Sequence, residues 1–236
     1  MARGDAEAGH VGPARRYERD RLFDLAPMGR DDTGADLFES APLPSALLRL
    51  YGGQPVAQGL WAAQQTMGSD RHPANCHACF LAPGAVDEPI RYTVRRDADG
   101  RSFSIRRITA QQGDRLILTM TATFHVAEHG PAAQTPVPDL AAPEDLPDME
   151  MLLRQAPREL PERHRPFWLR DHMFEWRPAE PFRMFERPRE PGAQHFWVRL
   201  KEPWTGPAGS EHTARLYVGP ASAACGACPD RGRLCR

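Results

Sequence analysis

The hydrophobic pattern of the chain changes its period between residues 63 and 90, and this change constrains the fold more than any other feature. After the pair Gly52-Gly53, apolar residues recur at helical spacing: Val56, Leu60 and Ala63. From residue 90 onward apolar and polar residues alternate, and in the longest run, from Leu116 to Val126, apolar side chains occupy the even positions. One buried helix followed by long antiparallel strands with one buried face predicts an α+β fold whose sheet wraps the helix.

Local signals place the other elements. The glycine pair, followed by Pro55, predicts that the helix begins at Gly52 or Gly53. The tetrapeptide Asp97-Ala98-Asp99-Gly100 and the tripeptide Gln112-Gly113-Asp114 predict the turns between the strands. Apolar residues between 21 and 28 predict one or two helical turns, and residues 35–40 predict a strand. Residues 1–19 are polar and predict a disordered N-terminal segment before a domain that spans residues 20–128.

The second half of the chain has a different composition. Residues 129–170 are rich in proline and predict a linker with one helical patch at 149–155. Residues 171–214 predict the start of a second unit, with strands near 172–182 and 193–201. Residues 215–236 form a tail whose sequence fits neither unit.

Composition and charge exclude several classes of function. Apolar residues make up 41% of the 236 residues and charged residues 26%, which is typical of globular proteins. The net charge of -1 gives no field that would attract nucleic acid. Neither a signal peptide nor an apolar run of about 18 residues is found, so we expect a cytoplasmic protein without a membrane span.

The five cysteines include two C-x-x-C pairs, Cys76/Cys79 and Cys225/Cys228, and this spacing raises the question of a zinc site. The first pair lies in a predicted strand, where residues three apart point to opposite faces and cannot close on one ion. The second pair lies in the tail. We therefore expect no metal site.

Four blocks of sequence, in order, resemble the acyl-CoA thioesterase II family of double-hotdog enzymes: residues 51–54, 76–84, 99–107 and 120–124. Residues 174–178 and 195–199 are similar to the opening strands of its second hotdog. The resemblance implies a complete N-terminal hotdog and an incomplete second one. It also implies an acyl-CoA substrate, hydrolysis to fatty acid and CoA by an activated water, no cofactor, and a homo-oligomer of the folded protein.

The resemblance and the local chemistry together suggest three substrate-binding residues. Gly53 and Gln54 begin the predicted helix, where unpaired N–H groups suit an oxyanion. The alternative is that the glycines only allow close packing of the helix. His77 is a candidate binding residue, although a histidine in an apolar strand is more often structural. Arg106 and Arg107 could meet the phosphates of CoA, but a solvated pair of arginines is commoner.

The chain departs from the family pattern near its end. The family places a catalytic Asp in a Tyr-x-Ser-Asp segment of the second hotdog, followed by a catalytic Thr and Gln. Residues 215–227 instead read Arg-Leu-Tyr-Val-Gly-Pro-Ala-Ser-Ala-Ala-Cys-Gly-Ala, and no residue of this chain matches the three catalytic positions.

One explanation is a shifted reading frame, because suitable codons for this tail can encode Tyr-Thr-Ser-Asp one nucleotide later. We therefore expect a truncated second domain, impaired thioesterase activity and poor solubility. A non-catalytic hotdog that binds acyl-CoA or a partner protein is the alternative function. A hydratase or dehydratase would need its own acid/base pair, and the sequence offers no convincing one.

Overall fold

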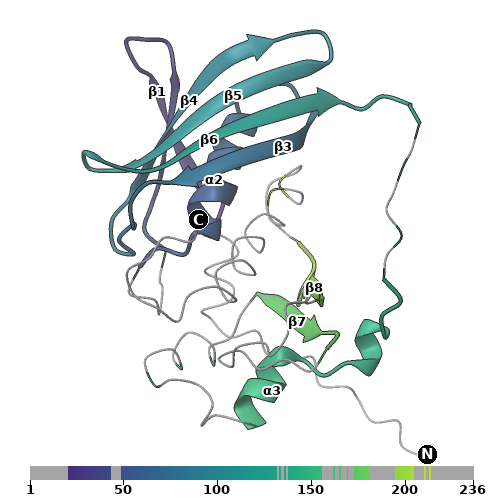
Figure 1. The fold of residues 1–236 in the computed structure, drawn as a ribbon. Coiled ribbons are helices and arrows are strands. Elements are labelled where there is room, and N and C mark those ends of the chain that lie inside the picture. Colours follow the sequence, from purple (N-terminus) through teal and green to yellow (C-terminus); the bar gives the residue numbers. More distant parts are fainter. Residues whose placement is uncertain are drawn as a thin grey trace, which may run out of the picture.

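The computed structural model describes residues 21–43, 49–131, 138–155, 173–180 and 195–204, and the single residues 133, 136, 162, 165, 169, 210 and 213. Within these residues one six-stranded antiparallel sheet has the strand order β1-β2-β4-β5-β6-β3 (Figure 1). Its strands are β1 (Leu25–Arg30), β2 (Asp36–Ser40), β3 (Arg71–Phe80), β4 (Ile90–Asp99), β5 (Phe103–Gln112) and β6 (Arg115–Val126).

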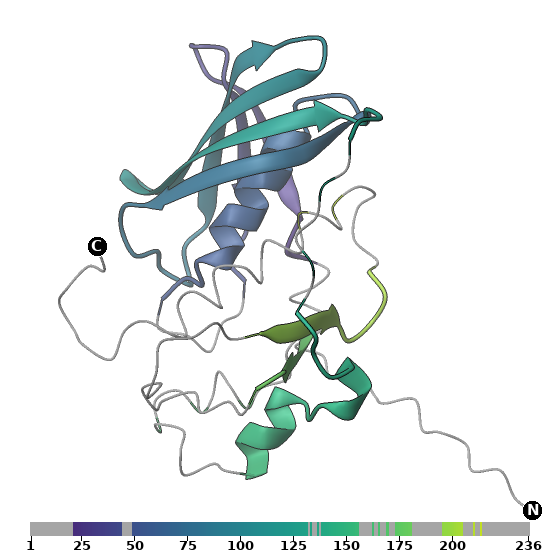
Figure 2. The same cartoon turned by 45° about the vertical axis from the view of Figure 1, so that its right-hand side comes forward.

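The helix α2 (Gly53–Gln64) lies against the concave face of this sheet (Figures 1 and 2). Its Val56, Leu60 and Ala63 belong to one buried cluster with the inward-facing residues of the strands. Gly59 allows the close approach, since a Cβ there would lie 3.1 Å from Met120 Cε and 3.3 Å from Ile108 Cγ2. The sheet therefore wraps the helix, as the change of hydrophobic period predicts.

The opposite side of α2 is covered by a second buried cluster. Ala57 and Trp61 pack there with apolar residues that precede the helix and with two that follow the large sheet in sequence: Leu22, Phe23, Leu43, Met173 and Phe174. Met173 precedes and Phe174 begins the strand β7 (Phe174–Pro178), which pairs with β8 (Phe196–Leu200) in a two-stranded antiparallel sheet. The helix α3 (Met149–Gln155), preceded by the short 3-10 turn η1 (Pro143–Asp145), packs beside this small sheet.

Most elements lie where the sequence predicts them. The predicted helix, the strands on both sides of the turn at Gly113 and the helical patch at 149–155 are confirmed. Gly113 has φ +55°, which suits a tight turn between β5 and β6. Residues 1–19 and 215–236 lie outside the described residues, and the domain boundaries remain predictions.

Two local predictions were wrong in part. Of the residues predicted to form one or two helical turns, 21–24 do form a turn, in which the Asp24 N–H donates to the Arg21 carbonyl at 3.2 Å. Residues 25–30 instead form the strand β1, because they pair with β2 in a hairpin that Asp31 closes: its Oδ1 accepts hydrogen bonds from the Thr33 and Ala35 N–H groups. The segment Asp97–Gly100 is not a complete turn. β4 continues to Asp99 through a bulge after Arg96, and the chain reverses at residues 100–102, where Gly100 N–H donates to the Phe103 carbonyl at 2.8 Å.

Candidate functional site

Two unpaired backbone N–H groups mark the beginning of α2. The Gln54 N–H donates to the Tyr51 carbonyl at 3.0 Å, and Pro55 has no N–H group. The N–H groups of Gly52 and Gly53 donate to no other described residue, and no side chain caps the helix. These two donors lie at the positive end of the helix dipole, where a developing negative charge is stabilised.

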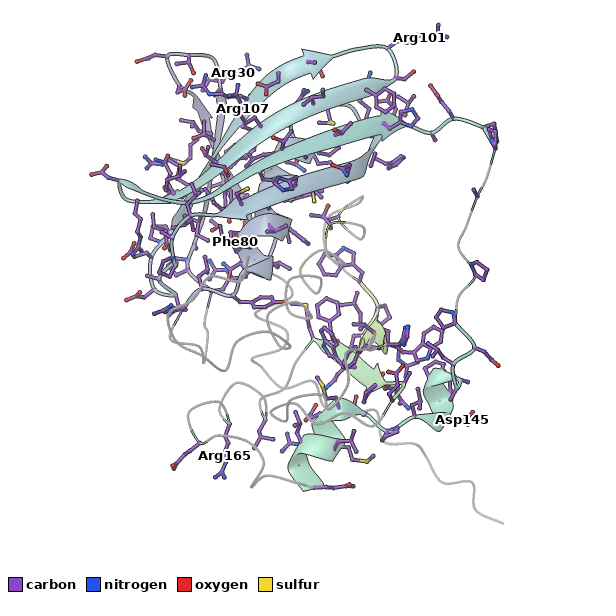
Figure 3. All side chains as sticks on the ribbon, viewed as in Figure 1. Arg30, Phe80, Arg101, Arg107, Asp145 and Arg165 are labelled. Carbon is purple, nitrogen blue, oxygen red and sulfur yellow. The ribbon has the colours of Figure 1, made fainter. Side chains whose placement is uncertain are left out.

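The ring of Phe80 covers one side of this helix start (Figure 3). Phe80 ends β3, and its Cζ would lie 3.2 Å from a Cβ at Gly52, so the ring packs against the glycine itself. The side chain is 54% exposed. It provides an apolar wall beside the two donors, and a lower local dielectric strengthens their electrostatic effect.

A series of hydrogen-bonded polar side chains runs from the helix start into the core. Gln54 is nearly buried, and its Nε2 lies 3.4 Å from Gln58 Oε1. The same oxygen of Gln58 accepts a hydrogen bond from the Tyr92 hydroxyl at 2.7 Å, and its Nε2 donates to the Leu22 carbonyl at 2.8 Å. Burial raises the pKa of Tyr92 well above its usual value, so its hydroxyl remains a donor at neutral pH.

The structure does not bring His77 to the helix start. Its neighbours in β3, Cys76 and Ala78, pack against the core, while His77 is exposed on the opposite face of the strand. His77 Nδ1 lies 3.9 Å from Cys79 Sγ on that outer face. Of the three predicted substrate-binding residues, Gly53 and Gln54 lie at the helix start and His77 does not. A substrate-binding role for His77 therefore has no support from this placement.

The geometry of Cys76 and Cys79 agrees with the sequence argument. Cys76 is half-buried against the core, where burial raises the pKa of its thiol, and Cys79 is exposed. The two side chains point to opposite faces of β3. Cys225 and Cys228 lie outside the described residues.

The two arginines of β5 differ sharply. Arg107 is exposed and pairs with Asp97 at 3.0 Å. Arg106 is only 1% exposed, and its guanidinium is fully engaged with neighbouring protein groups. Arg106 is therefore a structural residue in this domain and cannot reach the phosphates of CoA.

Sequence reasoning missed three residues of the site: Phe80, Gln58 and Tyr92. Gln58 carried a usable signal, because a glutamine four residues after Gln54 lies on the same side of an otherwise apolar helix. Tyr92 occupies an inward position of an alternating strand, where a buried phenol requires a hydrogen-bond partner. The contact between Phe80 and Gly52 depends on tertiary packing and has no local signal.

Residues 40–125 match the family model described as the acyl-CoA thioesterase N-terminal domain. The chain is 36% identical over 151 residues to acyl-CoA thioesterase 2 of Haemophilus influenzae, an alignment that covers 64% of this chain and 53% of that protein. It is 33% identical over 174 residues to human acyl-coenzyme A thioesterase 8, covering 70% of this chain and 54% of the relative. The chain thus spans about half the length of these relatives.

Solved structures share the fold. An acyl-CoA thioesterase II from Mycobacterium marinum superposes with a TM-score of 0.63 at 23% identity, covering 86% of this chain and 68% of that one. A tesB protein of Mycobacterium avium subsp. paratuberculosis gives the same TM-score of 0.63 at 25% identity, covering 86% and 67%. Together with the wrapped helix, these matches confirm the predicted hotdog fold. Residues 40–125 therefore form an acyl-CoA thioesterase N-terminal domain, and over the aligned residues the chain is similar to the acyl-CoA thioesterase II family.

Proposed function

We propose that the protein hydrolyses fatty acyl-CoA to a free fatty acid and CoA, and that the start of α2 binds the thioester carbonyl. The observation that supports this proposal is the pair of unpaired N–H groups at Gly52 and Gly53, placed in a domain that matches thioesterases. The chain spans about half the length of its relatives. The hydrolysis is therefore proposed for the whole protein and not for the matched N-terminal domain alone.

The reaction begins when a water molecule attacks the carbonyl carbon of the thioester. As the new C–O bond forms, the carbonyl oxygen becomes an oxyanion, and the N–H groups of Gly52 and Gly53 donate hydrogen bonds to it. The intermediate then collapses, the C–S bond breaks, and the CoA thiolate leaves with the electron pair. A proton released by the attacking water is available for the thiolate, so the products are a carboxylic acid and a thiol.

Activation of the water needs a polar group outside the helix start. The family resemblance implies an Asp, Gln and Thr set for this step, and residues 215–227 do not supply the Asp segment. This departure supports a second candidate function, in which the hotdog domain binds acyl-CoA or a partner protein without turnover. We further propose a cytoplasmic location and assembly into a homo-oligomer. Among the helices that the structure describes, none has the length and apolar character of a membrane span.

Turnover and binding separate the two candidates. Hydrolysis is measured by release of free CoA thiol from acyl-CoA substrates of several chain lengths, and binding by calorimetry with the non-hydrolysable thioether S-octyl-CoA. Hydrolysis supports the thioesterase, and binding without hydrolysis supports the second candidate. A folded protein that neither binds nor hydrolyses any of these compounds would overturn the thioesterase and the binding of acyl-CoA in the second candidate.

A substitution at Gly53 tests the oxyanion contact itself. Gly53→Pro deletes one N–H donor at the first position of the helix. Gly52 has the αR backbone (φ -58°, ψ -30°) that a following proline disfavours, but it has no Cβ to add to the clash. We expect kcat to fall about 100- to 1,000-fold, the usual cost of removing one such donor. Gly53→Ala retains the N–H and is the matched control. Equal kcat values for a folded Gly53→Pro variant and the control would exclude the contact.

A further inference from the structure

We propose that Gln54 serves the bound thioester as a hydrogen-bond acceptor through its Oε1, and that Gln58 is the positioning residue that fixes this orientation. The inference rests on the proposed function, because it assigns a role within the same site. Four hydrogen-bonding groups between the core and the helix start support it: the Leu22 carbonyl and the side chains of Gln58, Tyr92 and Gln54.

The Leu22 carbonyl determines which way Gln58 points. A backbone carbonyl can only accept, so the atom of Gln58 that lies 2.8 Å from it must be the amide nitrogen. The amide oxygen of Gln58 must then point away from Leu22. Because Gln58 is fully buried, no water competes for either atom, and the orientation of the carboxamide is fixed.

Tyr92 occupies one side of the oxygen of Gln58. Its hydroxyl lies 2.7 Å from Gln58 Oε1 and, like Gln58, is buried. A buried phenol remains protonated at neutral pH, so the hydroxyl donates to this oxygen. The phenol therefore stabilises the same orientation of Gln58 that the Leu22 carbonyl requires.

Gln54 must present its nitrogen to this oxygen. Its Nε2 lies 3.4 Å from Gln58 Oε1, and the opposite orientation would bring two amide oxygens together. The Oε1 of Gln54 therefore points away from Gln58, and in the part of the chain that the structure describes it accepts no hydrogen bond. The residue is 7% exposed, so its free acceptor lies at the boundary between the core and the helix start.

A hydrogen-bond donor is the ligand chemistry that such an oxygen recognises. Two sources exist in the proposed reaction: the O–H of the attacking water and the amide N–H of the pantetheine arm of CoA. A contact to the water acts in the transition state, so its loss lowers kcat. A contact to pantetheine acts equally in the substrate complex, so its loss raises KM and weakens binding of S-octyl-CoA.

Two substitutions at Gln58 separate a positioning role from simple packing. Gln58→Leu retains an apolar volume but removes both polar atoms. Gln58→Glu reproduces the glutamine pattern only while the carboxyl is protonated, because its O–H then donates to the Leu22 carbonyl. Burial raises the pKa of a carboxyl at this position. A packing role predicts that leucine is tolerated and glutamate is not.

The positioning role predicts the reverse order. We expect kcat/KM of Gln58→Leu to fall about 10- to 100-fold, as for other small displacements of a reacting group. We expect Gln58→Glu to keep near wild-type kcat/KM at low pH and to lose it as pH rises and the carboxyl ionises, while the wild type shows no such loss. Ser104→Ala is the control: it removes a buried hydroxyl that contacts Asp99 rather than Gln58, and we expect it to keep the wild-type dependence of kcat/KM on pH.

A readout independent of activity distinguishes failure of this inference from failure of the proposed function. In ¹H–¹⁵N spectra of the free protein, the side-chain amide of Gln54 should be protected from exchange and should lose that protection in Gln58→Leu. If protection is seen but the wild type neither binds nor hydrolyses acyl-CoA, the proposed function fails and the role in catalysis fails with it. If Gln58→Leu is folded and fully active, or if Gln58→Glu is inactive at every pH, the positioning role is refuted.

Discussion

Replacement of Arg106 by methionine and by lysine separates two ways in which a buried guanidinium can stabilise this domain. Its Nε donates to Thr66 Oγ1 at 2.7 Å, just beyond the end of α2. Its Nη1 donates to the carbonyls of Ala98 and Ile105 at 3.1 and 3.0 Å, and its Nη2 to Asp99 Oδ1 at 2.8 Å. The planar fork thus connects the helix to β4 and β5, which a single point charge cannot do.

The two variants differ in what they leave buried. Methionine fills a similar volume and loses all five hydrogen bonds of the guanidinium, of which the fifth, from Nη2 to the Thr66 carbonyl, is long at 3.5 Å. Each lost bond costs about 0.5–1.5 kcal/mol, but methionine no longer buries a charge. We expect a net loss of about 2 kcal/mol. Lysine keeps the charge but cannot reach Thr66 and Ala98 together, so it leaves an ammonium group with too few partners. We expect that variant to lose about 3–5 kcal/mol.

Urea unfolding at pH 7, followed by circular dichroism, measures both losses. With an m-value of about 2 kcal/mol/M, the midpoint should fall by about 1 M for Arg106→Met and by about 2 M for Arg106→Lys, with m unchanged. If Arg106→Lys is the more stable of the two, charge rather than the fork determines the effect. If Arg106→Met is as stable as the wild type, the hydrogen bonds contribute nothing and the reasoning fails.

Three further predictions follow from contacts in the same domain. Burial acts to raise the pKa of Asp99, but hydrogen bonds from Ser104 and Arg106 outweigh it and lower that pKa. The contribution of ionised Asp99 to the free energy of unfolding is therefore complete above its unfolded pKa of about 3.9 and is lost as pH falls through its lower folded pKa. In urea titrations, the difference in unfolding free energy between wild type and Arg106→Met should be smaller at pH 3 than at pH 7. Gly59→Val should cost about 2–3 kcal/mol in thermal unfolding, because its side chain meets Met120 and Ile108, whereas Gly59→Ala should cost less since alanine favours the helix; equal melting temperatures for wild type and Gly59→Val would contradict the close packing. Tyr92 should not ionise near pH 10, so the difference in 295 nm absorbance between wild type and Tyr92→Phe should stay flat there, and a step with a midpoint near pH 10 would show that the phenol is not buried.

The sequence predicts the elements whose signals are local. The glycine pair and Pro55 identify the start of α2, and the alternation from Leu116 to Val126 identifies β6, because helix starts and half-buried strands leave a pattern in neighbouring residues. The strand β1 was not predicted from the sequence. Its apolar spacing fits a helix, and only the partner strand β2 selects the extended form.

The site was predictable in part for the same reason. Gly53 and Gln54 follow from the helix start, whereas the contact between Phe80 and Gly52 joins positions that only the folded sheet brings together. His77 is the contrasting case. Its place in a family block suggested a site residue, but the alternation along β3 directs its side chain away from the helix.

The second buried cluster has a consequence for synthesis of the protein. Trp61 leaves the ribosome about 110 residues before Phe174, which covers the same side of α2 in the finished fold. At about 5–20 residues per second, part of that apolar surface stays uncovered for about 6–23 s. In the last part of this interval, once Val126 has emerged, the nascent chain contains all six strands of the large sheet but still lacks Met173 and Phe174 on one side of its central helix. A chaperone that binds apolar segments should therefore associate with ribosomes stalled before Phe174 and dissociate once β7 and β8 have emerged.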